Sequence, residues 1–492
     1  MKHVATAVAL VIAPVVAHAQ ITPSEYAARR AALAASIGPG SVILARGAPE
    51  PPQDYESFYQ SSPFEYLTGV HEPDAALLIE RRGTTVRTML FVQPADADRE
   101  VWTGTRMGPT GATARTGLPA RPAAALRLTL DSMLARDSTL YVVGDLDSPA
   151  NGSLTSDAQY VRTLAESHPG LHVVDATPQV ARLRGTKSPA ELALIAKAVA
   201  ITVDAERAAI AMVAPGLNEF EVQARIEYTF RRDGADRPSF ASIVGSGPNT
   251  TTLHYNADDR FMADGDLVVM DVGASYRGYA GDVTRTVPVN GTYTPDQRAI
   301  YQLVRDAQAA AERQAVVGAP SRLMNDSATA VLAAGLARLG LIESPAATYD
   351  CAPDAGEGRR CAQYTLYYMH GLGHGIGLDV HDPDQFYYSG RIEPGSAFTI
   401  EPGVYVRANL ASIVPPTPRN RAMLAAIGPA AARYANIGVR IEDDYIATAD
   451  KVERVSTAPR EASEIEAAMR QRAPSAEPRD TTKIGWYRST PR

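Results

Sequence analysis

Residues 24–175 alternate between short apolar runs and longer segments in which apolar positions recur every three or four residues. The pattern predicts strands at 41–45, 75–80, 88–92, 139–143 and 172–175, and helices at 24–37, 123–135 and 157–167. Strands that alternate with helices indicate an α/β layered domain of about 150 residues. Because this region has no cluster of histidines and acids, we expect it to supply packing, oligomer contacts or one wall of a cleft.

The rest of the chain shows one order of elements twice. After an expected hinge at 177–187, two helices (189–213 and 218–232) precede a strand hairpin within 266–287. Two further helices (294–317 and 323–339) precede a glycine-rich loop and strands at 396–400 and 437–447. This order predicts an internal pseudo-twofold repeat with one site between its halves.

Length and charge limit the classes of protein. A chain of 492 residues with 45% hydrophobic and 21% charged residues is globular and too long for one compact core. We expect a signal segment at 1–19, an α/β domain at 20–178, a catalytic domain at 179–473 and a loose tail at 474–492. The formal net charge of −7 argues against nucleic acid or an anionic membrane as the main partner.

The first 19 residues have the composition of a secretory signal. Lys2 supplies the charged start, 4–16 the apolar core, and Ala17-His18-Ala19 a cleavage site. The apolar run is too short for a membrane span. We therefore expect an exported protein, periplasmic or secreted.

The sequence contains two cysteines, Cys351 and Cys361, on either side of a polar loop. In an exported chain they predict a disulfide, with two unpaired surface thiols as the alternative. No histidine accompanies them, which argues against a metal site there.

Two acids mark the hairpin within 266–287. Asp271 ends one apolar run and Asp282 precedes the next, and the local cations are Arg277 and Arg285. Carboxylates beside apolar strands are costly unless a positive charge meets them. A bound metal is the sharper explanation, although Asp271 alone could be an ordinary turn residue.

Other segments supply a matching set of metal ligands. His374 lies in HGLGHGIGLDVHD, Glu401 in TIEPG and Glu442 in VRIEDD. With Asp271 and Asp282 they give four carboxylates and one imidazole, whose charge of −4 matches two divalent cations. Such oxygen-rich coordination favours Mn, with Co, Fe and Zn left open.

A two-metal centre polarises a carbonyl and generates hydroxide near neutral pH, so the predicted reaction is hydrolysis of an acyl bond. Glu401 could accept the proton of the water, and His254 and His381 could bond the carbonyl and the tetrahedral intermediate. His370 and Arg440 are the expected substrate-binding residues, Arg440 also orienting the acids. Loop packing is the alternative for His254, His370 and His381, and a plain ion pair with Glu442 is the alternative for Arg440.

These motifs resemble the pita-bread metallopeptidases, which include methionine aminopeptidase, prolidase and aminopeptidase P. DVG with GDVTRT, HGLGHGIGLDVHD, TIEPG, VRIEDD and TLHY match the catalytic domain, and TLHY contains His254. SSPFEYLTGVHEPDAALL and REVWTGTRMG resemble the N-terminal domain of aminopeptidase P, which methionine aminopeptidases lack. The resemblance implies a ribonuclease H-like, creatinase-type N-terminal α/β domain followed by an α+β pita-bread domain.

The implied function is that of an exported dinuclear aminopeptidase that hydrolyses the N-terminal Xaa-Pro bond by a metal-bridged hydroxide. Its partners would be peptides with proline second, and it would form a dimer or tetramer. An Xaa-Pro dipeptidase is the nearest alternative, because residues 407–436 and the cysteine loop depart from the family pattern and could reshape the pocket. A scaffold that binds peptides without catalysis would lack a ligand, and a creatinase-type hydrolase would not keep the full acid set.

Overall fold

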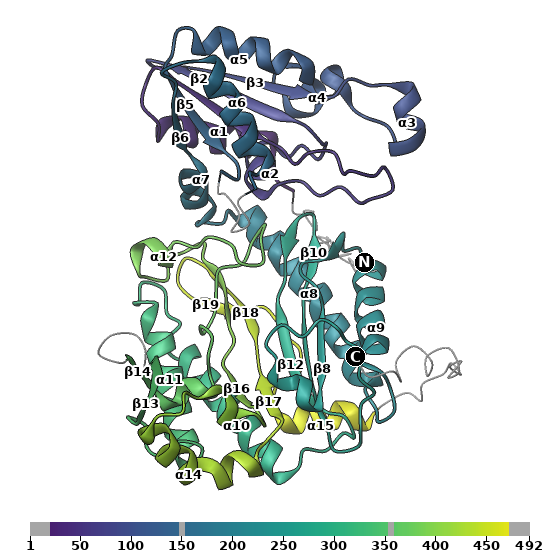
Figure 1. The fold of residues 1–492 in the computed structure, drawn as a ribbon. Coiled ribbons are helices and arrows are strands. Elements are labelled where there is room, and N and C mark those ends of the chain that lie inside the picture. The colour runs from purple at the N-terminus through teal and green to yellow at the C-terminus, as the bar shows by residue number, and fades with distance from the viewer. Residues whose placement is uncertain (1–19, 147–152, 353–358, 472–492) are drawn as a thin grey trace, which may run out of the picture.

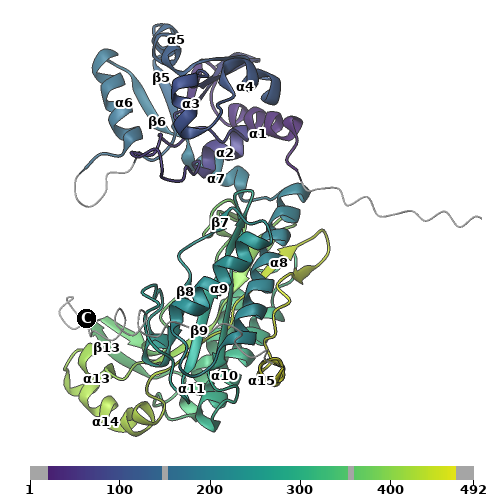
Figure 2. The ribbon, with the colours of Figure 1, turned by 90° about the vertical axis from the view of Figure 1, so that its right-hand side faces the viewer.

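The computed structural model describes residues 20–146, 153–352 and 359–471. The expected signal segment and the expected tail lie outside these residues. A first part runs from α1 to α7 and a second from α8 to α15, and the two lie one above the other in both views (Figures 1 and 2). The domain boundaries given above stay a prediction.

A mixed six-stranded sheet forms the first part. Its strands, in spatial order, are β4 (Ala120–Pro122), β3 (Thr85–Val92), β2 (Ala76–Arg82), β1 (Ser41–Arg46), β5 (Thr139–Val143) and β6 (His172–Asp175). Strands β1, β5 and β6 are parallel, whereas β2 is antiparallel to both β1 and β3. This arrangement confirms the predicted α/β class of the first part.

Helices cover both faces of this sheet. The first face packs on α1 (Pro23–Ala35), α2 (Ser62–Thr68) and α7 (Thr177–Arg184), and the second on α5 (Leu126–Leu134) and α6 (Ser156–Ser167). Two further helices, α3 (Ala97–Thr103) and α4 (Gly108–Thr116), follow β3. Alternate residues of β1 point to opposite faces: Ile43 belongs to the first core and Leu44 to the second.

The segment predicted as a hinge is mostly helical. Residues 177–184 form α7, with Pro178 in its first turn and Val180 buried against the first core. At its end, the buried Arg184 bonds the carboxylates of Asp379 and Asp382 in the second part. Four residues, 185–188, lie between α7 and α8, and Lys187 N donates to Gly395 O at 2.9 Å, so the connection is held by contacts with the second part.

The second part contains the predicted repeat. Its first half comprises α8 (Pro189–Met212), α9 (Glu219–Arg232), β8 (Ile243–Ser246), β9 (Leu267–Val272) and β12 (Val283–Pro288). Its second half comprises α10 (Pro295–Glu312), α11 (Arg322–Arg338), β15 (Ala397–Ile400), β16 (Gly403–Val406), β17 (Ile437–Arg440), β18 (Asp443–Ala447) and β19 (Val452–Arg454). Helices α14 (Pro418–Arg433) and α15 (Ala462–Arg470) complete it. The repeated order of two helices and a hairpin is confirmed.

Capping boxes start three of these helices. In each, the side chain of the cap residue accepts a hydrogen bond from a backbone N–H in the first helical turn. The side chain of the third helical residue accepts one from the backbone N–H of the cap residue. The pairs are Ser188–Glu191, Asn218–Glu221 and Thr294–Gln297. The starts of α8, α9 and α10 therefore follow directly from the sequence.

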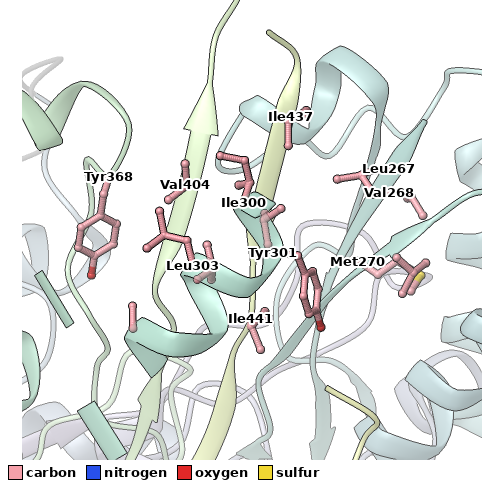
Figure 3. Close-up of a cluster of buried hydrophobic side chains, with 14 of the residues drawn as sticks. Leu267, Val268, Met270, Ile300, Tyr301, Leu303, Tyr368, Val404, Ile437 and Ile441 are labelled. Atoms are coloured by element: carbon pink, nitrogen blue, oxygen red, sulfur yellow. The ribbon is translucent and has the colours of Figure 1, made fainter. Parts of the chain in front are cut away.

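Strands of both halves share one apolar layer. Figure 3 shows Ile300, Tyr301 and Leu303 of α10 beside β16, which carries Val404, and beside Ile441, which directly follows β17; all five side chains are buried. Because α10 contacts β16 and β17 and joins the core that β9 enters, it fixes the strand ends of the two halves relative to each other.

One strand differs from the predicted pattern, and the structure shows what the long connection and the cysteine loop form. The strand expected at 437–447 is broken between Arg440 and Asp443, where the backbone N–H of Glu442 donates to Thr284 O at 3.1 Å. The connection at 407–436 is largely helical, as α14. Cys351 and Cys361 form the predicted disulfide, between β13 (Thr348–Ala352) and β14 (Arg359–Ala362). Among the described residues, none of the helices combines the length and the apolar character that a membrane span requires.

Candidate metal centre and active site

A single cavity of about 500 Å³ brings all nine predicted site residues together. They are His254, Asp271, Asp282, His370, His374, His381, Glu401, Arg440 and Glu442. The segments that carry them lie up to 188 positions apart in sequence, between residues 254 and 442, and both halves of the repeat contribute. The roles assigned to them remain proposals.

Three of these residues form the centre of the cavity. Asp282, His374 and Glu442 each place a donor atom within 4.8 Å of the others. His374 Nε2 lies 3.5 Å from Asp282 Oδ2, 3.5 Å from Glu401 Oε1 and 3.9 Å from Glu442 Oε1. One imidazole thus faces three carboxylates.

Strand pairing places the remaining acid beside them. Asp271, in β9, is directly opposite Thr284 in β12, and Thr284 follows Asp282 by two residues. Since side chains alternate across a strand, Asp282 and Thr284 share the face on which Asp271 lies. Thr284 Oγ1 donates to Glu442 Oε2 at 2.7 Å, which joins the two halves of the repeat.

The histidine loop runs alongside β15 and bonds its backbone. Thr399 N donates to His374 O at 2.9 Å, and Glu401 N donates to Leu372 O at 2.7 Å. The backbones approach so closely at Gly373 that a Cβ there would lie 2.1 Å from Thr399 O. The glycine is therefore required by this packing, and it holds His374 and Glu401 side by side.

Gly373→Ala is expected to destabilise the protein by about 1–3 kcal/mol, because the added methyl forces the loop away from β15. Urea unfolding of the variant measures this loss. Gly371→Ala is the matched control, since a Cβ at Gly371 meets nothing within 4 Å, and we expect it to change stability by less than about 1 kcal/mol. Equal stability of the two variants would show that the close backbone approach is absent in solution.

The tautomer of His374 leaves a lone pair directed at the acids. Its Nδ1 lies 3.1 Å from Gly375 O, which can only accept, so Nδ1–H donates and Nε2 is free. Burial, and then the neighbouring His381, lowers the pKa of His374 to about 4. The ring is therefore neutral, in the form that binds metals.

The acids cannot all be charged without a counter-ion. Burial, and then the charge of Asp271, raises the pKa of Glu442 to about 8. Burial, and then the charge of Glu442, raises the pKa of Asp282 and of Glu401 well above the usual range. Within the described part of the chain, Asp271 Oδ1, Asp282 Oδ1 and Glu442 Oε1 are buried without a hydrogen-bond partner. Unfilled acceptors beside a free imidazole nitrogen fit divalent cations.

Arg440 is committed to protein groups. Its guanidinium pairs with Asp271 and donates to Tyr405 Oη at 2.9 Å and to Thr284 Oγ1 at 3.3 Å. Because these bonds occupy the guanidinium, they favour the predicted role of Arg440 in orienting the acids over direct contact with a substrate.

Tyr405 is a site residue that the sequence reasoning missed. Its hydroxyl lies 2.9 Å from His370 Nε2, and His370 Nδ1 lies 2.7 Å from Gly371 O. Nδ1–H therefore donates to the carbonyl, and the Tyr405 hydroxyl donates to Nε2 while accepting from Arg440. No local pattern marks Tyr405: it lies two residues after Gly403, and the pairing of Gly403 with Arg440 across β16 and β17 brings it to the site.

Two histidines stand at the exposed edge of the cavity. His254 follows a short 3₁₀ helix (Gly247–Thr251), and His381 lies in the loop after His374. The rings of His374 and His381 have centroids 4.1 Å apart. Their exposure leaves both able to reach a molecule in the cavity.

The two-part architecture, with a pita-bread second part and a metal-fitting donor set, defines a metal-dependent exopeptidase. The sequence profile of metallopeptidase family M24 matches residues 193–449, and that of the aminopeptidase P N-terminal domain matches residues 26–141. The chain belongs to metallopeptidase family M24. The predicted family and fold are thereby confirmed.

Relatives match almost from end to end. The chain is 33% identical to the Xaa-Pro aminopeptidase of Escherichia coli K12 over 460 residues, which covers 92% of this chain and 98% of the relative. It is 32% identical to the Xaa-Pro aminopeptidase of Haemophilus influenzae, with the same coverage of 92% and 98%. The solved structure of E. coli aminopeptidase P with the inhibitor Pro-Leu superposes with a TM-score of 0.76 at 31% identity, over 92% of this chain and 98% of that one.

The expectation of an exported, periplasmic or secreted protein was wrong. Relatives that match over most of their length, such as the E. coli aminopeptidase, are cytoplasmic enzymes, and residues 1–19 lie outside the described residues. A charged start followed by an apolar run is a feature of composition, and composition alone does not establish a cleaved signal.

Proposed function

We propose that this protein is a dinuclear aminopeptidase that removes the first residue of peptides whose second residue is proline. The observation that carries the proposal is the convergence of four carboxylates and one neutral imidazole on a single cavity, with three carboxylate oxygens unfilled. The relatives named above are Xaa-Pro aminopeptidases, and one of their solved structures holds the inhibitor Pro-Leu. A dimer or tetramer is the assembly we expect.

Asp271, Asp282, His374, Glu401 and Glu442 would hold two divalent cations, with Mn first and Co, Fe and Zn as alternatives. When bound, such cations supply Lewis acidity and make water a nucleophile near neutral pH. The remaining steps are assigned to side chains of the chain itself.

Glu401 accepts the proton of the attacking water and delivers it to the leaving nitrogen. Its carboxylate lies between His374 Nε2 at 3.5 Å and His370 Nδ1 at 3.7 Å, at the wall of the cavity. His254 and His381 bond the scissile carbonyl as negative charge develops on its oxygen. Both side chains are exposed at the edge of the cavity, which leaves them accessible for this contact.

The leaving side is adapted to a proline ring. His370 lines the cavity with its Nε2 already bonded to Tyr405, so the ring is held in one orientation. Phe240, Ile243 and Val380 add an apolar wall to the same cavity. The nitrogen of an Xaa-Pro bond carries no hydrogen, so a proline substrate loses no hydrogen bond where this wall of the cavity is apolar.

A comparison of peptides tests the function. We expect hydrolysis of Ala-Pro-Ala with release of alanine, complete loss of activity after chelation, and recovery on addition of MnCl₂. Release of free alanine from the tripeptide and from the dipeptide Ala-Pro is measured side by side. Cleavage of Ala-Pro alone would replace the proposal by an Xaa-Pro dipeptidase, and activity that survives chelation would remove the metal mechanism.

A further inference from the structure

Three adjoining cavities extend from the active site to the boundary between the two parts. The catalytic cavity of about 500 Å³ shares Val380 and His381 with a second one of about 270 Å³. The second shares Arg237, Ser275 and Gly278 with a third of about 860 Å³. These shared residues place the three cavities next to one another, from His381 past Arg237, and together we call them the exit groove.

The direction of the substrate decides what the exit groove can hold. An aminopeptidase binds the free amino end of a peptide inside the catalytic cavity, so the rest of the peptide lies on the carboxyl side of the cleaved bond. A path that leaves this cavity therefore faces the residues that follow proline. The volume of the third cavity exceeds that of the catalytic one, which leaves room for several such residues.

Arg237 stands at the middle of the exit groove with its charge unmatched. It belongs to β7 (Arg237–Pro238), which pairs with β10 (Ala274–Tyr276) and is thereby fixed in place. Its guanidinium stacks on the ring of Tyr59, with Cζ 4.1 Å from the centroid. Within the described ranges, no carboxylate lies at ion-pair distance from it. Stacking orients the guanidinium and leaves its N–H donors available.

The acids close to Arg237 are engaged elsewhere. Asp236 accepts from Gly278 N at 3.1 Å, and Asp379 accepts from Arg184 at 2.6 Å and from Ser62 Oγ at 2.6 Å. A negative group from outside the chain is therefore the partner that Arg237 lacks.

The wider surroundings are also positive. The third cavity is lined by six arginines and two acids. One of the arginines, Arg29, is paired with Glu25 and Glu191, which leaves five arginines against the two acids, and one of these acids, Glu65, lies 3.4 Å from His71. Low-dielectric walls that carry one sign of charge concentrate ions of the opposite sign. The exit groove is thus suited to a carboxylate and unsuited to a basic residue.

We propose that the exit groove binds the part of the peptide that follows proline, and that Arg237 binds a carboxylate there. The carboxylate is either the side chain of an acidic residue or the α-carboxylate of a short peptide. This inference rests on the proposed function and names the substrate class within it: peptides with proline second and a negative charge shortly after.

Three peptides separate the two sources of the carboxylate. They are Ala-Pro-Ala-Glu-amide, Ala-Pro-Ala-Gln-amide and Ala-Pro-Ala-Gln with a free carboxyl end. We expect the wild-type protein, loaded with MnCl₂ at low ionic strength, to favour at least one charged peptide over the neutral amide by about three- to tenfold in kcat/KM. Raising the salt concentration should reduce the preference, since the groove is open to solvent.

Arg237→Gln should remove the preference, mainly through KM, and Arg237→Lys should keep part of it, because lysine retains the charge and loses the planar fork. Arg225→Gln is the matched control: Arg225 also stacks on a tyrosine, Tyr228, but it lines none of the three cavities. It should keep the full preference.

The outcomes are distinct. No preference in the wild-type protein, or an equal preference in Arg237→Gln, would overturn this inference while cleavage of all three peptides upheld the proposed function. Failure of the wild-type protein to cleave any of them would overturn the proposed function and this inference together.

Discussion

Replacing His374 with alanine is expected to lower kcat/KM by about 10³-fold or more and to reduce the amount of bound divalent metal. His374 is the single imidazole among the five proposed ligands, and its free Nε2 faces Asp282, Glu401 and Glu442 at 3.5, 3.5 and 3.9 Å. Without it the remaining ligands are all carboxylates, which repel one another and hold protons more readily. Steady-state kinetics and metal analysis of the purified variant measure the two losses.

His172→Ala is a suitable control for this variant. His172 begins β6 in the first part, is exposed, and lines none of the cavities described above. We expect it to keep both the activity and the metal content. Full metal content in His374→Ala would contradict the assignment of His374 as a ligand, whatever its activity.

Much of the site could be predicted because its residues lie on regular, strongly patterned segments. Asp271 and Asp282 flank apolar strands, and their acidity stands out where a strand should be uniformly apolar. His374 lies in a loop whose glycines permit close backbone contact, as the short distance at Gly373 demonstrates. Composition and periodicity carry this information directly.

Other features depend on contacts that no local pattern encodes. Tyr405 looks like one more apolar strand residue until β16 pairs with β17 and places it beside Arg440. The helix α7 looks like a linker because its charge partners, Asp379 and Asp382, lie almost 200 residues further on. Such long-range pairs are set by tertiary packing, which overrides local propensity.

The exit groove illustrates the same limit in a different way. Arg237, Tyr59 and His381 come from three distant segments, and nothing in their neighbours marks them as parts of one path. Residues of both parts line the third cavity, whereas the second is lined by residues of the second part alone. The sequence therefore predicts the chemistry of the centre better than the residues that line the exit groove.

Glu401→Gln is expected to lower kcat by about 10²–10⁴-fold while KM changes little. The amide matches the carboxylate in size and can still offer an oxygen to a metal, but it cannot accept and return a proton. The backbone would hold the new side chain in place, since residue 401 N donates to Leu372 O at 2.7 Å. Single-turnover kinetics with Ala-Pro-Ala, together with metal analysis of the same preparation, measure the effect.

Metal analysis of the variant shows whether the lost rate reflects Glu401 as a proton acceptor or Glu401 as a metal ligand. If Glu401→Gln keeps its metal and loses its rate, Glu401 acts on the proton. If the metal is lost as well, Glu401 matters first as a ligand, and the proton acceptor must be sought elsewhere. Glu453→Gln, at an exposed Lys451 pair in β19, removes one carboxylate far from the cavity and should change neither quantity. A rate close to that of the wild-type protein in Glu401→Gln would exclude the proposed proton transfer by Glu401. In the described part of the chain no other carboxylate lies as close to both His370 and His374, so none stands ready to replace it.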